Sequence, residues 1–441
     1  MRLRLALALS AGALLAGAVP ARAQLSYDAR RTGMAGATLS RDGELGRFNP
    51  AYHAVPARGR QGAKLTIPIP LGLIQALNDS VAFDFDSSYF NPIALVYYIL
   101  HPPLLYEVKK LPTPTNDVEF TIGQDSLIVD LGSAAQLVPT DRVGFGGTSH
   151  LTDIGTTIKG VHVGVVLWVN RELGYELGDT LQRFLREADP ARTNTTYGSD
   201  GDALAQTGFA PTLGYAGRIA GDSTRGLYVG AAVHYYLGAA YGSARGTVGF
   251  VTGDTLLAGS NPVTPTADVE VKYSRFGNRL GHGVGGDVGV VYASGPVEIG
   301  FGVNDIGSTL TWPDTRVERD TFDTATNNIH KTLLADHVSS KTRLPVTYIA
   351  NASLELGTNT TAGVVVLDNE RGASIRLGVE QRVGVFALRG GVARDQQKKV
   401  QLGWGGGLRF GAFGLDVGFV THSSSFSTAR GITMATSISI Y

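Results

Sequence analysis

The 441-residue sequence contains no cysteine. It can therefore form no disulfide framework and no thiolate metal site, and it offers no cysteine nucleophile. Charge is also scarce, because Asp, Glu, Lys and Arg make up 17% of the residues, against about 25% in soluble domains. The 38 basic and 38 acidic residues balance, so the chain lacks the basic excess that favours nucleic acid or an anionic membrane surface. We expect no nucleic-acid partner.

Long apolar runs are absent beyond the N-terminus. Arg2 and Arg4, the apolar residues 5–19 and an A-x-A motif ending at Ala23 predict a signal peptide over residues 1–23, cleaved near Ala23. A retained anchor is the alternative, but the apolar run is short for a membrane helix. Later runs are all shorter than the about 18–20 residues that a spanning helix needs. The exported chain is therefore either soluble or a membrane β-barrel, since only helices and closed barrels satisfy their backbone groups in lipid.

Glycine and alternating strands are what the sequence has in abundance. Glycine accounts for 58 of the 441 residues, about twice its usual share. Apolar residues occupy every second position in stretches such as Ile375–Glu380 and Leu415–Phe419. This pattern predicts an all-β fold, a transmembrane antiparallel β-barrel of about 14 strands. A soluble sandwich or propeller is the rival, but we find no repeat of about 40–50 residues.

Short inserts interrupt the strands. Asn91–Leu100 and Thr180–Ala188 read as short helices, and Val118–Leu131 reads as a hairpin. Arg316–Arg343 reads as a long loop. We expect most aromatic residues to form interfacial girdles rather than to stack on a ligand; these are Trp168, Trp312, Trp404, Tyr228, Tyr235, Tyr236, Tyr273 and Tyr292.

Motifs that would indicate enzymatic chemistry are weak. Gly281–Gly286 matches G-x-G-x-x-G, but a strand follows it where a dinucleotide site needs a helix. His422 lies beside three serines without a nucleophile elbow. Asp202, Asp222 and Asp254 lie near glycines and are interpreted as turn acids rather than calcium ligands. We therefore expect no catalytic residue, no metal site and no cofactor, and the sequence identifies no ligand-binding residue.

The first part of the mature chain is irregular and rich in glycine. Its features are the run RTGMAGA over residues 31–37, an acidic turn around Asp42–Glu44, and Asn49-Pro50-Ala51. Asn49 should be extended because it precedes proline. The segment resembles the N-terminal plug of the FadL/TodX superfamily of outer-membrane barrels, and equally that of its PorV-type and conjugal-transfer TraF-like relatives.

The last third of the chain also carries the resemblance. Three stretches resemble the PorV-type and TraF-like branch most: Val303–Ser308, Arg343-Leu344-Pro345 and the ending from Leu388 to His422. The resemblance implies a barrel over residues 62–441, closed internally by a plug over residues 24–61. It places Gly33, Gly36, Asn49 and Pro50 in the lumen and the protein in the cell outer membrane.

Two functions follow from this resemblance. The first is a plugged channel for uptake of hydrophobic small molecules, with outer-membrane lipid around it, a hydrophobic ligand and an apolar pocket beside the plug. The alternative is a barrel that serves protein secretion or conjugal transfer as a docking or structural component, with secretion or conjugation proteins as partners. An enzyme is not expected.

Overall fold

The computed structural model describes residues 28–39, 43–56, 65–69, 105–106, 117–122, 125–130, 141–186, 189, 191–254, 263–274, 279–326, 328–396, 398–421 and 432–440. The predicted signal peptide, the boundary at residue 61, the first helical insert and His422 lie outside these residues. No helix among the described residues is long and apolar enough to cross a membrane.

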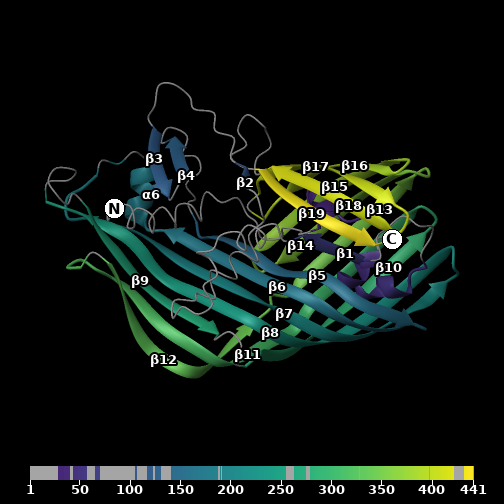
Figure 1. The fold of residues 1–441 in the computed structure, drawn as a ribbon, viewed down its shortest axis with the longest axis horizontal. Coiled ribbons are helices and arrows are strands. Elements are labelled where there is room, and N and C mark those ends of the chain that lie inside the picture. Colours follow the sequence, from purple (N-terminus) through teal and green to yellow (C-terminus); the bar gives the residue numbers. More distant parts are fainter. Residues whose placement is uncertain are drawn as a thin grey trace.

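Antiparallel strands make up most of the described chain (Figure 1). Seventeen of them form one sheet, and β3 and β4 form a separate hairpin, as predicted for residues 118–131. The strands are β1 (Leu65–Ile69), β2 (Leu105–Tyr106), β3 (Asp117–Ile122), β4 (Asp125–Asp130), β5 (Val143–Ile158), β6 (Val161–Leu177), β7 (Thr196–Gly221), β8 (Arg225–Thr252), β9 (Val263–Ser274), β10 (Gly281–Ser294), β11 (Val297–Asp323), β12 (Asn328–Arg343), β13 (Thr347–Leu356), β14 (Thr360–Asn369), β15 (Gly372–Val383), β16 (Phe386–Arg394), β17 (Val400–Phe410), β18 (Phe413–Thr421) and β19 (Ile432–Ile440).

Fourteen of the seventeen strands follow one another around the barrel. Pairing runs from β5 through β6, β7, β8, β10, β11 and β13, then in chain order to β19, which pairs with β1. The other three, β2, β9 and β12, pair only with strand ends. The prediction of an all-β antiparallel barrel of about 14 strands is confirmed.

Three strands are far longer than the rest of the barrel. β7, β8 and β11 have 26, 28 and 27 residues. Their far ends, together with β9 and β12, continue the sheet beyond the barrel on the left of Figure 1, and we call this part the sheet extension. The loop predicted over Arg316–Arg343 is therefore wrong, since these residues belong to the β11–β12 hairpin. The sequence predicts two strands here, Val297–Val303 and Ser308–Thr315. They form the single strand β11, which is irregular at Asp305 and Gly307, whose φ angles are +61° and +69°.

Side chains alternate between the two faces of the barrel wall. In β15, Ile375, Leu377 and Val379 are 44%, 49% and 44% exposed, whereas Arg376 and Glu380 are 8% and 2% exposed. The apolar face therefore points outward and the polar face inward, as the sequence pattern predicted.

The girdle prediction is wrong for four of the eight aromatic residues. Trp168, Trp312, Tyr228 and Tyr236 are at most 1% exposed and lie inside the barrel. The adjacent Tyr235 is 47% exposed on the outer face, because successive residues of a strand point to opposite faces. Composition alone could not distinguish these two positions.

The helices are short. α2 (Ala29–Thr32), η1 (Gly43–Arg47) and η2 (Pro50–Ala54) precede the first strand, and α6 (Asp179–Arg186) matches the second predicted insert. The Asp28 carboxylate caps α2 by accepting from Arg30 N at 2.8 Å. Asn49 caps η2 in an extended conformation, with φ −154° and ψ 107°, as its position before proline predicted.

Candidate functional site

Residues 28–39 and 43–56, here called the luminal segment, lie inside the barrel. They are the purple ribbon enclosed by the strands in the right half of Figure 1. Every residue from Asp28 to Leu39 is buried. A buried segment without a sheet of its own must satisfy its backbone and polar groups through the wall. Its contacts with the wall therefore decide how firmly it is held.

Glycines of the wall let the luminal backbone approach closely. A Cβ placed on Gly418 would lie 2.1 Å from the carbonyl oxygen of Ala29, and one on Gly391 would lie 2.4 Å from that of Met34. Such distances are far below van der Waals contact, so no larger residue fits without displacing the segment. The same holds at Gly230, Gly363 and Gly403. Part of the high glycine content is thus explained by this contact.

A buried ionic network links α2 to the wall. Arg30 Nε lies 2.8 Å from Glu380, which also accepts from Arg389 at 2.8 Å and from Arg382 at 2.9 Å. Arg389 in turn contacts Asp416 at 2.7 Å. The side chains of Arg30, Glu380, Arg389 and Asp416 are at most 3% exposed. Charges this deeply buried are tolerated only when they are paired and hydrogen-bonded.

Neutral hydrogen bonds link η2 to the wall. Asn49 Nδ2 donates to the carbonyl oxygens of Val290 and Phe301, each at 3.1 Å. Asn351 donates to the hydroxyl of Tyr52 at 2.5 Å. Burial raises the pKa of Tyr52 above its usual value, so this phenol stays protonated. The two ends of the luminal segment are therefore held by different chemistry.

The four residues that the resemblance assigned to a plug all contact the inner wall. A Cβ on Gly33 would lie 3.0 Å from Gly405 Cα. Gly36 adopts φ +87° beside the side chain of Arg376, a conformation that favours glycine. Pro50 packs on Gly230, and Asn49 binds as described above. That these residues close a channel remains a prediction.

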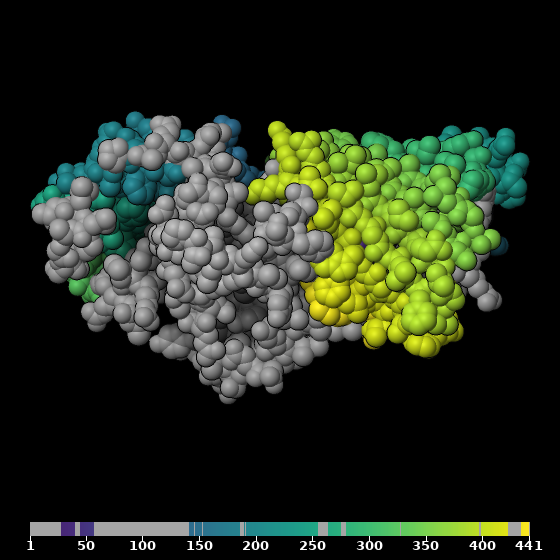
Figure 2. All heavy atoms as spheres, turned by 90° about the horizontal axis from the view of Figure 1, so that it is seen from above, coloured from purple at the N-terminus to yellow at the C-terminus, as the bar shows by residue number. Residues whose placement is uncertain are grey.

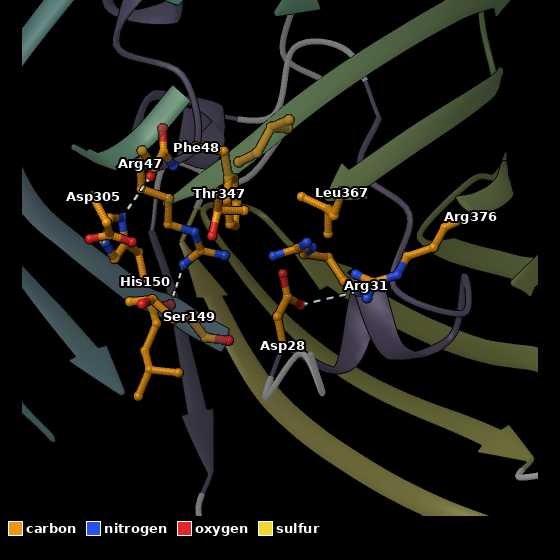
Figure 3. A pocket seen from close by; sticks show the side chains of 14 residues that line it. Asp28, Arg31, Arg47, Phe48, Ser149, His150, Asp305, Thr347, Leu367 and Arg376 are labelled. Atoms are coloured by element: carbon orange, nitrogen blue, oxygen red, sulfur yellow. Dashed lines mark hydrogen bonds and ion pairs between the residues drawn. The ribbon is translucent and has the colours of Figure 1, made fainter. Parts of the chain in front are cut away.

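A small cavity lies between the luminal segment and the wall (Figure 3). Its volume is about 50 Å³, and much of its lining is charged or polar, including Asp28, Arg31, Arg47, His150 and Arg376. An apolar cavity that takes up benzene has about 150 Å³. This cavity is therefore smaller than a site for such a molecule, and the apolar pocket beside the plug stays a prediction.

The wall opposite η1 carries a polar cluster that the sequence did not reveal. His150 Nδ1 donates to the carbonyl oxygen of Arg47 at 3.0 Å, and its Nε2 lies 3.5 Å from Asp305. Tyr236 donates to Asp305 at 2.6 Å, and the Asp305 amide donates to Asp287 at 2.8 Å. Asp305 belongs to the Val303–Ser308 motif, which was the one sequence feature that singled out a residue of this cluster.

His53 lies at the end of η2, close to His162 on β6. The two rings stack at 3.9 Å. Burial and, to a smaller extent, the neighbouring His162 lower the pKa of His53 to about 4, although Asp153 opposes the shift. His53 is therefore neutral at pH 7.

Other residues weighed from the sequence lie elsewhere. Gly281–Gly286 lies within β10, so it forms no phosphate-binding loop. Asp222 accepts from the hydroxyl of Thr224 and from the amides of Arg225 and Thr224 in a turn, and these bonds lower its pKa to about 2. Asp202 was predicted to be a turn acid, but it lies on the strand β7 and pairs with Arg371 at 3.3 Å.

Comparisons with known proteins found matches among solved structures only. No protein-family model and no curated protein matches the sequence. The structure is similar to that of the CymD monoaromatic hydrocarbon channel, with 12% identity and a TM-score of 0.32, covering 70% of this chain and 91% of that one. It is also similar to the Pseudomonas putida toluene transporter TodX, with 11% identity and a TM-score of 0.31, covering 70% and 91%.

Proposed function

We propose that the chain is an outer-membrane β-barrel channel, closed by the luminal segment, that takes up small hydrophobic molecules. The observation that supports it best is the apolar outer face of the barrel. Leu213, Val233, Val284, Ile299 and Leu388, on five different strands, are 51–62% exposed. Soluble monomers rarely expose contiguous apolar surface on this scale. We therefore assign lipid as the surrounding medium.

The connections between strands set the orientation that we propose. At the end of the barrel where β19 ends, two residues separate β5 from β6, β10 from β11, β15 from β16 and β17 from β18, and three separate β7 from β8 and β13 from β14. At the opposite end, two residues separate β14 from β15, but five separate β16 from β17 and 18 separate β6 from β7. The sheet extension lies at the opposite end. Outer-membrane barrels have short turns on the periplasmic side and longer connections outside. We assign the end where β19 ends, whose connections are all of two or three residues, to the periplasm.

One region of the barrel interior is suited to a hydrophobic ligand. Trp168, Tyr236, Tyr241, Leu310 and Trp312 form a buried cluster on the inner side of β6, β8 and β11. Aromatic side chains of this kind line sites for apolar ligands. Passage requires the luminal segment to move, because the cavity beside it has only about 50 Å³. The structure is then the closed state.

Reconstitution of the purified protein into liposomes tests this proposal. Toluene, which is named for one of the similar structures, is a suitable first molecule. We expect faster uptake than into empty liposomes, and slower migration of heated than unheated protein on a gel. Uptake equal to that of empty liposomes would contradict transport, and a soluble protein in the periplasm would contradict the barrel.

Docking of a secretion or conjugation protein is the second candidate. The sheet extension supports it, because β12 is largely exposed on a sheet that continues past the barrel. Replacing residues 316–340 by a short turn should abolish partner crosslinking and leave the heat-dependent gel shift intact. Retained crosslinking would count against this role.

A further inference from the structure

Three potential metal ligands meet where the luminal segment contacts the wall. His53 is on η2, Asp153 is on β5 and His162 is on β6. One ligand atom from each lies within 4.8 Å of the others. Two imidazoles and one carboxylate are the donor set of many divalent transition-metal sites, with the remaining position taken by water.

Two atoms of this cluster lack the hydrogen bonds that buried polar groups usually make. His162 is 4% exposed. Its Nε2 lies 2.9 Å from Asp153 Oδ2. This contact lacks the geometry of a hydrogen bond, and within the described part of the chain Asp153 Oδ1 has no hydrogen-bond partner either. Native structures leave few such groups, and an ion is one of the accepted explanations.

The other ring nitrogen of His162 is oriented by a neighbour. His162 Nδ1 and Thr157 Oγ1 are 3.1 Å apart, and the same hydroxyl lies 3.4 Å from His53 Nδ1. A hydrogen bond to one nitrogen fixes the ring and leaves the other nitrogen available to a metal, which is the usual arrangement of a ligating histidine.

Glycines surround the three side chains. A Cβ on Gly46 would lie 2.3 Å from His53 Cε1, and one on Gly164 would lie 2.5 Å from Asp153 Oδ1. A Cβ on Gly155 would lie 2.7 Å from His162 Cε1. The side chains therefore occupy a space that only glycine leaves open, in the segment and in both strands.

We propose that His53, Asp153 and His162 bind a divalent transition-metal ion of the Zn²⁺ class and thereby link the luminal segment to the barrel wall. His162 follows the two-residue turn between β5 and β6 by one residue, so the site lies near the mouth of the barrel and an ion can reach it. The stacked rings are only 14° from parallel. One ring must turn about its side-chain torsions for both nitrogens to face one ion.

The test uses the full-length protein in detergent, stripped with a chelator and titrated with Zn²⁺ alone by calorimetry. We expect one ion per chain and a higher unfolding temperature of the wild-type protein in its presence. His53→Ala and Asp153→Asn should each weaken binding by more than about tenfold and remove the thermal shift. His330→Ala is the matched control, since His330 is exposed on β12 and should bind as the wild type does.

Absence of binding to folded wild-type protein would overturn the proposal. Binding that His53→Ala leaves unchanged would also overturn it, because the ion would then lie on the wall and not link the segment to it. The heat-dependent gel shift verifies that each variant is folded. A His162→Ala variant can be added as a third test. If it fails to fold, the comparison of Zn²⁺ binding between His53→Ala and the wild type still tests the proposal, since His53 belongs to no barrel strand. These outcomes do not depend on whether the channel transports toluene.

Discussion

The substitution Arg30→Met removes the ionic link between the luminal segment and the wall. Methionine keeps the length of the apolar part of the side chain and loses the guanidinium. Glu380 then loses two bonds, from Arg30 Nε at 2.8 Å and from Arg30 Nη2 at 3.2 Å. It retains Arg382 and Arg389. The network changes from three cations and two carboxylates to two of each, so no carboxylate is left without a partner.

The free-energy cost of Arg30→Met depends on the ion pairs that Glu380 retains. Breaking a buried ion pair costs about 3–5 kcal/mol when the partner is left alone, and a hydrogen bond to a charged group contributes about 1.5–3 kcal/mol. Because Glu380 stays paired, we expect a cost of about 2–3 kcal/mol. Each 1.4 kcal/mol is a factor of ten, so the population with a released segment should rise about 30- to 150-fold.

Single-channel recording in planar bilayers measures this population as open probability. Arg319→Met is the matched control, because Arg319 pairs with Asp268 at 2.7 Å in the sheet extension, where both side chains are about half exposed. An exposed pair contributes little to stability because water and salt screen it, so the control should conduct like wild type. Equal open probability of Arg30→Met and Arg319→Met would refute the view that this network holds the channel closed.

Three further predictions follow from the wall and the segment. Gly391→Ala should cost about 1–3 kcal/mol by overpacking against Met34, whereas Gly390→Ala meets nothing within 4 Å; equal unfolding temperatures would contradict the contact. Asn49→Ala removes both bonds to wall carbonyls and should make the luminal segment easier to cleave by protease, and unchanged protection would show that Asn49 does not hold it. Leu377→Arg should destabilise the folded barrel in vesicles by about 2–4 kcal/mol if this outward side chain lies near the bilayer centre, and a neutral result would place it outside the lipid.

The barrel itself was predictable because its signal is local. Alternation in a stretch such as Ile375–Glu380 identifies a strand and its two faces without reference to the rest of the chain. It is harder to predict from the sequence where the alternation is interrupted within a strand. The positive φ angles of Asp305 and Gly307 interrupt β11, which made one strand read as two. Trp168 and Trp312 were misassigned for a related reason, since the face of a strand, not the residue type, decides between lipid and core.

The contacts of the luminal segment could not be predicted from local sequence patterns. Arg30 and Glu380 are 350 residues apart, and nothing in either neighbourhood indicates the other. The cluster of His53, Asp153 and His162 likewise forms only when η2, β5 and β6 meet. The resemblance located the segment within the barrel, but it could not identify the wall residues that hold it.

The contact between Ala29 and Ser437 also constrains how the chain folds. The Ala29 amide donates to Ser437 Oγ at 3.3 Å across 408 residues, and β1 pairs with β19, the last strand. The luminal segment is synthesised early and therefore has no complete binding surface until β19 has been made. Contacts of such long sequence separation slow folding. Closure of the barrel and docking of the luminal segment are thus one late kinetic event, and a chain that ends before Ile432 can complete neither.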